Sequence, residues 1–149
     1  MEKLRQLDVP PVAYSMKEEI MSNLPHQVIQ VNHYALDESP KVYAAAIKAL
    51  AKRTETEGHS GVLGYKFFVN ASDNTAGAVI TYSNADAWLG HHQLAYQWEE
   101  MVQLQATVSL KRVDLFGPLN DEVRTFMANV KSNFDYSHYD ELAAGFVRR

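Results

Sequence analysis

The chain has 149 residues, of which 46% are hydrophobic and 21% are charged, and its formal net charge is −4 at pH 7. This composition is typical of one soluble globular domain and excludes a disordered or fibrous chain. Nucleic acid and anionic membranes are disfavoured as partners because no lysine or arginine cluster concentrates positive charge, and the lack of cysteine excludes disulfides and thiolate zinc sites.

Residues 1–25 are interpreted as an N-terminal extension. Pro10 and Pro11 interrupt this segment, and Ser15 with Glu18 resembles a capping box that opens a short helix. The extension either clasps a partner subunit or packs as a terminal helix on its own domain. It lacks the apolar core of a signal peptide, and no apolar run approaches the length of a membrane span. We therefore expect a cytoplasmic protein.

The elements predicted between residues 26 and 117 follow the order βαββαβ. Strands are expected over residues 26–36, 62–70, 78–82 and 106–116, where apolar and polar residues alternate or aromatic residues are frequent. The first helix starts at Pro40 after an acidic turn and ends near Gly58. This order predicts a ferredoxin-like α+β domain over residues 26–117.

The second predicted helix covers residues 84–102 and is capped by Asn84. At ~100° per residue, its apolar side chains fall in one continuous arc. His91 lies near the centre of that arc, between Trp88 and Trp98. His92 falls at its edge and is expected at the surface. The helix therefore carries one imidazole into whatever it covers.

The sheet needs cover on both faces because apolar residues occur on both faces of its strands. The helices of a βαββαβ unit cover one face only. A second copy of the chain is the simplest cover for the other, which predicts a homodimer. In the tail, residues 118–149, one helix starts at Pro118 and Asn120, and Ser137 with Asp140 would cap a last short helix. This tail is expected to pack on its own domain or across the dimer.

The chain resembles the antibiotic biosynthesis monooxygenase (ABM) family of the dimeric α+β-barrel superfamily. The resemblance covers residues 26–117. The residues that carry it are Glu57 and Gly58, the strand GVLGYKFFVN, the segment AVITYSNADAWLGHH with His91, and the closing strand VDLFGPL. It implies a site between the helices and the sheet of each subunit. Cofactor-free members oxidise quinol-like aromatics with molecular oxygen, which needs a proton acceptor and a donor to the oxyanion.

Neither catalytic set known for such proteins is intact in this sequence. The haem-degrading branch resembles the chain at Asn32, but it has a tryptophan at the position of His91 and an iron-binding histidine near Met101. The quinol-oxidising branch has an asparagine and a tryptophan on the third strand, where this chain has Ala78 and Tyr82. We therefore expect no bound cofactor.

The candidate catalytic residues are His91 as proton acceptor and Asn32 or Tyr82 as hydrogen-bond partners of a substrate. The alternative is that His91 is a core histidine whose hydrogen bonds are satisfied and that Asn32 is an ordinary strand residue. His33 lies on the strand face opposite Asn32. Trp88, Trp98, Tyr65 and Phe67 are candidates for an aromatic substrate-binding wall, or they are simply core.

A metal site is not expected. The adjacent His91 and His92 point about 100° apart on a helix, unlike an i, i+4 pair that binds one ion. Two functions stay open: a protein that binds a small apolar or aromatic molecule and acts as a cofactor-free monooxygenase of quinol-like substrates, and a non-enzymatic dimeric ligand-binding or stress-associated module.

Overall fold

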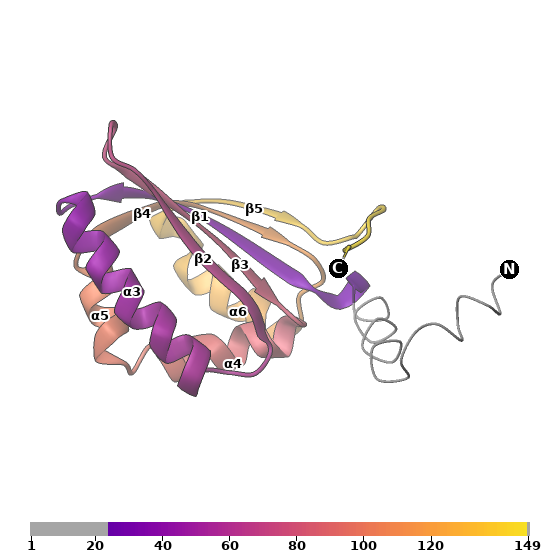
Figure 1. Ribbon diagram of the computed structural model, residues 1–149. Helices are drawn as coiled ribbons and strands as arrows, with labels where there is room; N and C mark the ends of the chain where they lie inside the picture. The colour runs from indigo at the N-terminus through magenta and orange to yellow at the C-terminus, as the bar shows by residue number, and fades with distance from the viewer. Residues whose placement is uncertain (1–23, 149) are drawn as a thin grey trace, which may run out of the picture.

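The structure, a computed structural model, describes residues 24–148 (Figure 1). The short helix predicted from Ser15 and Glu18 lies outside these residues. The elements in chain order are η1 (Leu24–His26), β1 (Val28–Leu36), α3 (Pro40–Glu57), β2 (Val62–Asn70), β3 (Thr75–Tyr82), α4 (Ala85–Ala95), α5 (Glu99–Gln105), β4 (Val108–Phe116), α6 (Asp121–Val130), η2 (Lys131–Asn133) and β5 (Asp135–Tyr139).

The strands form one sheet in the order β2-β3-β1-β4-β5. β1 pairs antiparallel with β3 and β4, β2 pairs antiparallel with β3, and β5 runs parallel to β4. The strands β1 to β4 therefore have the ferredoxin-like arrangement that the βαββαβ order predicted. β5 adds a further strand beyond β4.

Side-chain caps fix the starts of three helices. Ser39 accepts a hydrogen bond from the Val42 N–H at the start of α3, at 3.2 Å, and Pro40 occupies the first turn. Asn84 accepts from the Ala87 N–H at 2.9 Å, and Asn120 accepts from the Val123 N–H at 2.9 Å. Each cap satisfies a backbone donor that the helix itself leaves free.

The predicted helix over residues 84–102 is wrong in one respect, because it is two helices. α4 ends at Ala95, and Trp98, with an extended backbone, precedes α5. The break places Trp98 in a core cluster with Ala95, Leu104 and residues of α3. The segment 96–98 contains neither glycine nor proline, so its sequence gives no sign of a break.

The tail also differs from its prediction. α6 forms where a helix was expected, and it buries Val123 and Met127 in the main core. The last short helix expected from Ser137 and Asp140 is instead the strand β5. Its backbone pairs with β4, and the Tyr139 ring stacks on Phe116 with centroids 5.1 Å apart. Cross-strand pairing has overridden the local capping signal.

The turn between β4 and α6 depends on Gly117. Its φ is +111°, a conformation that favours glycine, and a Cβ atom there would collide with the Gln27 carbonyl. The Gly117 N–H donates to the Tyr139 carbonyl at 2.8 Å. The turn therefore joins the start of β1 to the end of β5.

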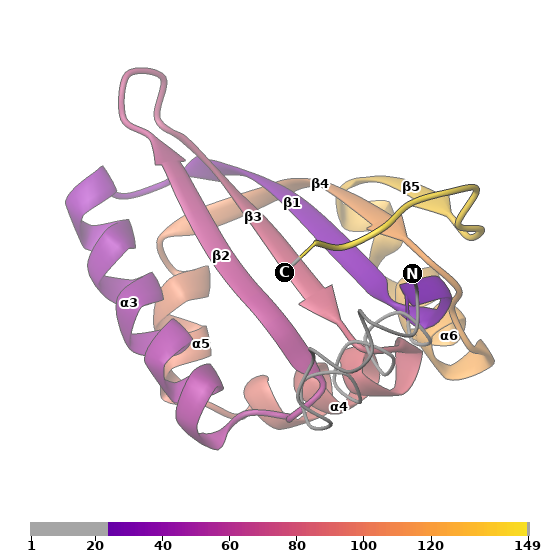
Figure 2. The same cartoon turned by 45° about the vertical axis from the view of Figure 1, so that its right-hand side comes forward.

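All the helices from α3 to α6 lie on one face of the sheet, as the views in Figure 1 and Figure 2 agree. Alternate residues of β1 point toward these helices, with Val28 and Leu36 buried at its two ends. The core lies in this layer between sheet and helices. The elements from β1 to α5 thus enclose the space in which the ABM resemblance places a site.

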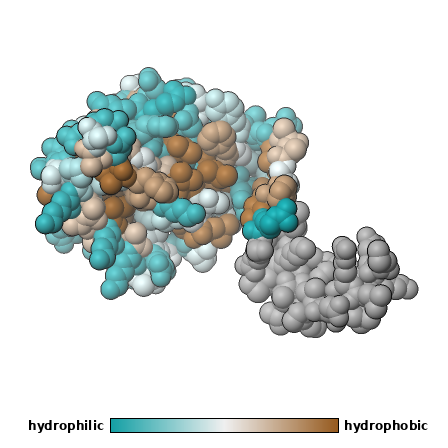
Figure 3. Space-filling model, turned by 45° about the horizontal axis from the view of Figure 1, so that its top comes forward, coloured by the Kyte–Doolittle hydropathy of each residue, from teal (hydrophilic) through white to brown (hydrophobic). Residues whose placement is uncertain are grey.

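No helix among residues 24–148 covers the opposite face, here called the open face. Phe68, Val79 and Phe116 lie on it and are 58%, 38% and 38% exposed. Figure 3, with the top of the molecule brought forward, shows apolar surface gathered over the strands. In Figure 2 the segment after β5 passes in front of this sheet. Exposed apolar side chains gathered on one sheet face are typical of a surface that associates with another.

Within residues 24–148, no helix combines the length and the apolar character that crossing a membrane requires. The same part of the chain holds no group of three or more histidine, aspartate or glutamate side chains placed to bind a metal ion.

Candidate functional site

A cavity of about 140 Å³ lies between the sheet and the helices α4 and α5. Its polar lining residues are Gln30, Asn32, Tyr34, Tyr65, Tyr82, His91, His92, Tyr96 and Gln105. Phe67, Ile80, Met101 and Leu110 are among its apolar lining residues. A cavity of about 150 Å³ holds one benzene molecule. The space therefore suits a ligand with one aromatic ring.

A chain of hydrogen bonds runs along the β1 side of the cavity. The Trp88 Nε1–H donates to Gln30 Oε1 at 2.7 Å, and Gln30 Nε2 donates to Asn32 Oδ1 at 2.8 Å. Asn32 Nδ2 then donates to the Tyr34 hydroxyl at 2.8 Å. Gln30, Asn32 and Tyr34 are alternate residues of one strand, so they share the face that the helices cover.

Two residues that line the cavity each carry a buried side-chain atom without a hydrogen-bond partner among the described residues: the Tyr82 hydroxyl and His91 Nδ1. Both residues are buried, with Tyr82 0% and His91 2% exposed. Buried polar groups are normally paired, and an unpaired one destabilises the fold. Their position on one cavity makes them candidates to bind a polar group of a ligand.

His91 projects from α4 into a ring of aromatic side chains. Its ring centroid lies 5.5 Å from that of Tyr65 and 5.8 Å from that of Tyr82. Burial lowers the pKa of His91 to about 4, and the nearby His59 adds a smaller effect in the same direction. The imidazole is therefore neutral at pH 7 and free to accept a proton, although it is a weak base.

His92 also lines the cavity, which corrects the prediction that it lies at the surface. Its Nδ1 lies 2.7 Å from the Trp88 carbonyl, and a carbonyl can only accept, so Nδ1 carries the proton. Its ring stacks on Trp88 at 3.7 Å and meets Phe126 of α6 at 5.8 Å. Burial lowers the pKa of His92 to about 3, although the hydrogen bond to the Trp88 carbonyl acts to raise it. α6 covers this side of α4, which the helical arc alone had assigned to solvent.

Burial also raises the pKa values of Tyr34, Tyr65 and Tyr82 above that of free tyrosine. Their hydroxyls therefore keep their protons at every physiological pH. At neutral pH the cavity holds neutral hydroxyls, amides and imidazoles.

The structure brings together His91, Asn32, Tyr82, Tyr65 and Phe67 of the residues singled out in the sequence, because all five line this cavity. The two tryptophans lie elsewhere. Trp88 lies behind the lining and bonds to Gln30. Trp98 lies in the second core cluster, with the Arg53 guanidinium 4.7 Å above its ring.

Three residues that line the cavity, Gln30, Tyr34 and Tyr96, were not among the predicted site residues. Gln30 and Tyr34 stand two residues before and after Asn32, so strand alternation places them on its face. His33 lies on the open face, where its Nε2 is 3.3 Å from Asp114 Oδ2. Tyr96 occupies the break between α4 and α5, which no sequence signal marked. His59, in the turn after α3, is half-buried, and its Nδ1 accepts from the Gly61 N–H at 2.9 Å.

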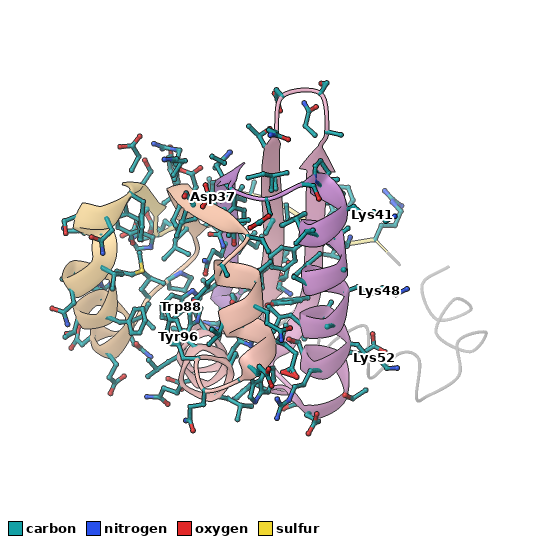
Figure 4. All side chains as sticks on the ribbon, turned by 90° about the vertical axis from the view of Figure 1, so that its left-hand side faces the viewer. Asp37, Lys41, Lys48, Lys52, Trp88 and Tyr96 are labelled. Atoms are coloured by element: carbon teal, nitrogen blue, oxygen red, sulfur yellow. The ribbon has the colours of Figure 1, made fainter. Side chains whose placement is uncertain are left out.

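A groove of about 420 Å³ runs along the surface between α3 and β2. Tyr65 and Phe67, whose ring centroids are 4.9 Å apart, line both this groove and the cavity. Lys48 and Lys66 also line the groove. Figure 4 shows Lys48 on the outer side of α3, pointing away from the sheet. The two aromatic rings thus form the wall between the cavity and the groove.

No family model and no curated protein matches the sequence. Among solved structures, MupZ from Pseudomonas fluorescens is 18% identical with a TM-score of 0.60, and the match covers 83% of this chain and 91% of MupZ. A mutant form of SnoaB, a cofactor-independent oxygenase from Streptomyces nogalater, is 16% identical with a TM-score of 0.53, covering 61% of this chain and 91% of SnoaB. A conserved protein from Methanosarcina mazei Go1 is 11% identical with a TM-score of 0.54, covering 64% and 95%. These matches confirm the fold that the ABM resemblance implied.

Proposed function

We propose that the cavity binds a phenol or quinol with one aromatic ring and that the protein oxidises it with molecular oxygen without a bound cofactor. The observation that carries this proposal is that two residues lining one small cavity, Tyr82 and His91, each have an unpartnered polar atom, the Tyr82 hydroxyl and His91 Nδ1. A phenolic oxygen and its proton would satisfy both. The fold shared with SnoaB supports the reaction class as an analogy only.

His91 would accept the phenolic proton, and the Tyr82 hydroxyl would donate to the phenolate oxygen. An imidazole whose pKa is about 4 in the empty cavity is a weak base, but a phenolate formed beside it raises the pKa of the imidazolium. The electron-rich phenolate then reacts with oxygen. For a phenol with a free para position, phenol and O₂ give para-quinone and water, and for a quinol, quinol and O₂ give quinone and hydrogen peroxide. In both cases the substrate supplies every electron and no external reductant is needed.

The test is oxygen consumption with phenol and hydroquinone in metal-free buffer, comparing the wild type with His91→Phe. Removing a general base reduces the rate by about 100-fold or more. His33→Phe is the matched control because His33 lies on the open face, and its rate should equal that of the wild type. A rate unaffected by His91→Phe would reject the role of His91.

A binding module without turnover is the second candidate. The low pKa values of His91 and His92, about 4 and about 3, favour it because such imidazoles are poor bases. Calorimetric titration with phenol separates the two candidates. Binding without oxygen consumption supports the module, and no binding contradicts both.

The proposed assembly is a homodimer that packs open face against open face. The exposed Phe68, Val79 and Phe116 support it, since an isolated chain would leave this apolar surface in water. The sheet of each subunit would then be covered on both sides, by its helices and by the second copy.

A further inference from the structure

The hydrogen-bond chain along β1 starts at a group that can only donate. The Trp88 indole N–H has no acceptor capacity, so the Gln30 atom at 2.7 Å from it must be the carbonyl oxygen. The Gln30 amide nitrogen therefore faces Asn32. Trp88 thus decides which way the Gln30 amide is turned.

The donor and acceptor of the next two hydrogen bonds, up to Tyr34, follow in the same way. Gln30 Nε2 only donates, so Asn32 Oδ1 faces it at 2.8 Å, and Asn32 Nδ2 is left to donate to the Tyr34 hydroxyl at 2.8 Å. The Tyr34 oxygen accepts that bond, and its own hydrogen points away from Asn32. Tyr34 lines the cavity.

The opposite direction is disfavoured at every step. If Tyr34 donated to Asn32, the Asn32 amide would have to turn and place its N–H₂ against that of Gln30. Turning Gln30 as well would place an N–H₂ against the Trp88 N–H. Gln30, Asn32 and Trp88 are all buried, and two donors that face each other in a buried site leave an unpaired N–H.

We infer that Trp88, acting through Gln30 and Asn32, is a positioning residue that holds Tyr34 as a hydrogen-bond donor to an acceptor oxygen of the bound ligand. This inference rests on the proposed function, in which a small aromatic ligand fills the cavity. Burial keeps the Tyr34 hydroxyl protonated, so it stays a donor. The ligand class narrows to aromatics with an acceptor oxygen, namely phenolates and the quinone carbonyls that their oxidation produces.

Two probes of nearly equal shape test the donor. Acetophenone carries a carbonyl oxygen where α-methylstyrene carries a methylene group. The wild type should bind acetophenone about tenfold more tightly, which is the effect of one good hydrogen bond. Tyr34→Phe should reduce this preference at least about fivefold while the affinity for α-methylstyrene stays within about threefold.

The infrared carbonyl stretch of bound acetophenone provides a readout that a structural role would not move. A donated hydrogen bond lowers its frequency, so the frequency should rise in Tyr34→Phe. It should also rise in Trp88→Phe, which keeps an aromatic ring against His92 but removes the N–H outside the cavity. Tyr136→Phe, which removes a tyrosine hydroxyl from β5 outside the cavity, is the control and should leave the frequency unchanged. If Trp88→Phe does not fold, Gln30→Met removes the same hydrogen bond between Trp88 and Gln30.

The outcomes separate this inference from the proposed function. If the wild type binds neither acetophenone nor α-methylstyrene, both the inference and the proposed function are overturned. Binding of both probes with equal affinity, and one carbonyl frequency in all proteins, overturns the inference and leaves the cavity as a binding site. A frequency that changes in Tyr34→Phe but not in Trp88→Phe or Gln30→Met overturns the role of Trp88.

Discussion

Burying His91 as a neutral imidazole couples the stability of the fold to pH. Its pKa is about 4 in the folded protein, against 6.5 for a free histidine. Between these values the unfolded chain binds a proton that the folded chain does not, so stability falls as pH falls from about 6.5 to about 4. Above pH 6.5 the His91 imidazole is neutral in both the folded and the unfolded chain, so this loss of stability vanishes.

We predict that the free energy of unfolding drops by about 2 kcal/mol between pH 7 and pH 5 through His91 alone. Urea unfolding at the two pH values measures this drop. His91→Phe should make it smaller by that amount. An equal drop in wild type and His91→Phe would show that His91 titrates normally.

The unpartnered hydroxyl of Tyr82 predicts opposite effects on stability and binding. Tyr82→Phe removes a buried group that makes no hydrogen bond, so the fold should be unchanged or stabilised by up to about 1 kcal/mol. The affinity for phenol should fall about tenfold, since a bond to the ligand is lost. Thermal unfolding and calorimetric titration measure the two effects. Destabilisation by more than about 1 kcal/mol would reveal a partner for the hydroxyl within the protein.

At the level of elements, Tyr65 and Phe67 of β2 would limit the size of the ligand that we propose. They separate the cavity from the groove beside α3. Phe67→Ala removes one ring of this wall, so a ligand with two fused rings should extend from the cavity into the groove.

We expect Phe67→Ala to increase the affinity for 1-naphthol by about tenfold, as further apolar area becomes buried. The affinity for phenol should change little, which serves as the control within the same variant. Fluorescence titration with 1-naphthol gives the measurement. A parallel loss of both affinities would mean that the substitution collapses the cavity.

The order of the elements could be predicted from the sequence because each strand of the βαββαβ unit carries its own alternation. Asn32 was singled out by the resemblance to the haem-degrading branch, and strand alternation places Gln30 and Tyr34 on the same face as Asn32. The break at Trp98 could not be predicted, because the apolar arc continues through it. β5 could not be predicted because its pairing depends on the edge that β4 presents. His92 was wrongly assigned to solvent, because the helix that covers it, α6, lies far along the chain and helical periodicity within α4 does not reveal it.

For the whole molecule, the proposed homodimer depends on the open face. Val79 lies on β3, beside Val31 of the central strand β1, and is 38% exposed. A charge at this position would be buried without a partner in a face-to-face dimer. Val79→Lys should therefore convert the proposed dimer to a monomer.

Sedimentation velocity at several concentrations measures this change. Val102→Lys is the control because Val102 is 58% exposed on α5, on the opposite side of the molecule. It should sediment as the wild type does. If the wild type is itself a monomer at every concentration, the open face does not associate.

The outer strands of the sheet, β2 and β5, bear on whether the protein aggregates. Free strand edges invite other chains to add on, and natural sheets block them with bulges, lysines and short strands. β2 has an irregular register between Val62 and Gly64 and carries Lys66, while β5 is only 5 residues long. The sheet can therefore offer an apolar face to one partner while its borders resist the strand-by-strand growth that leads to amyloid.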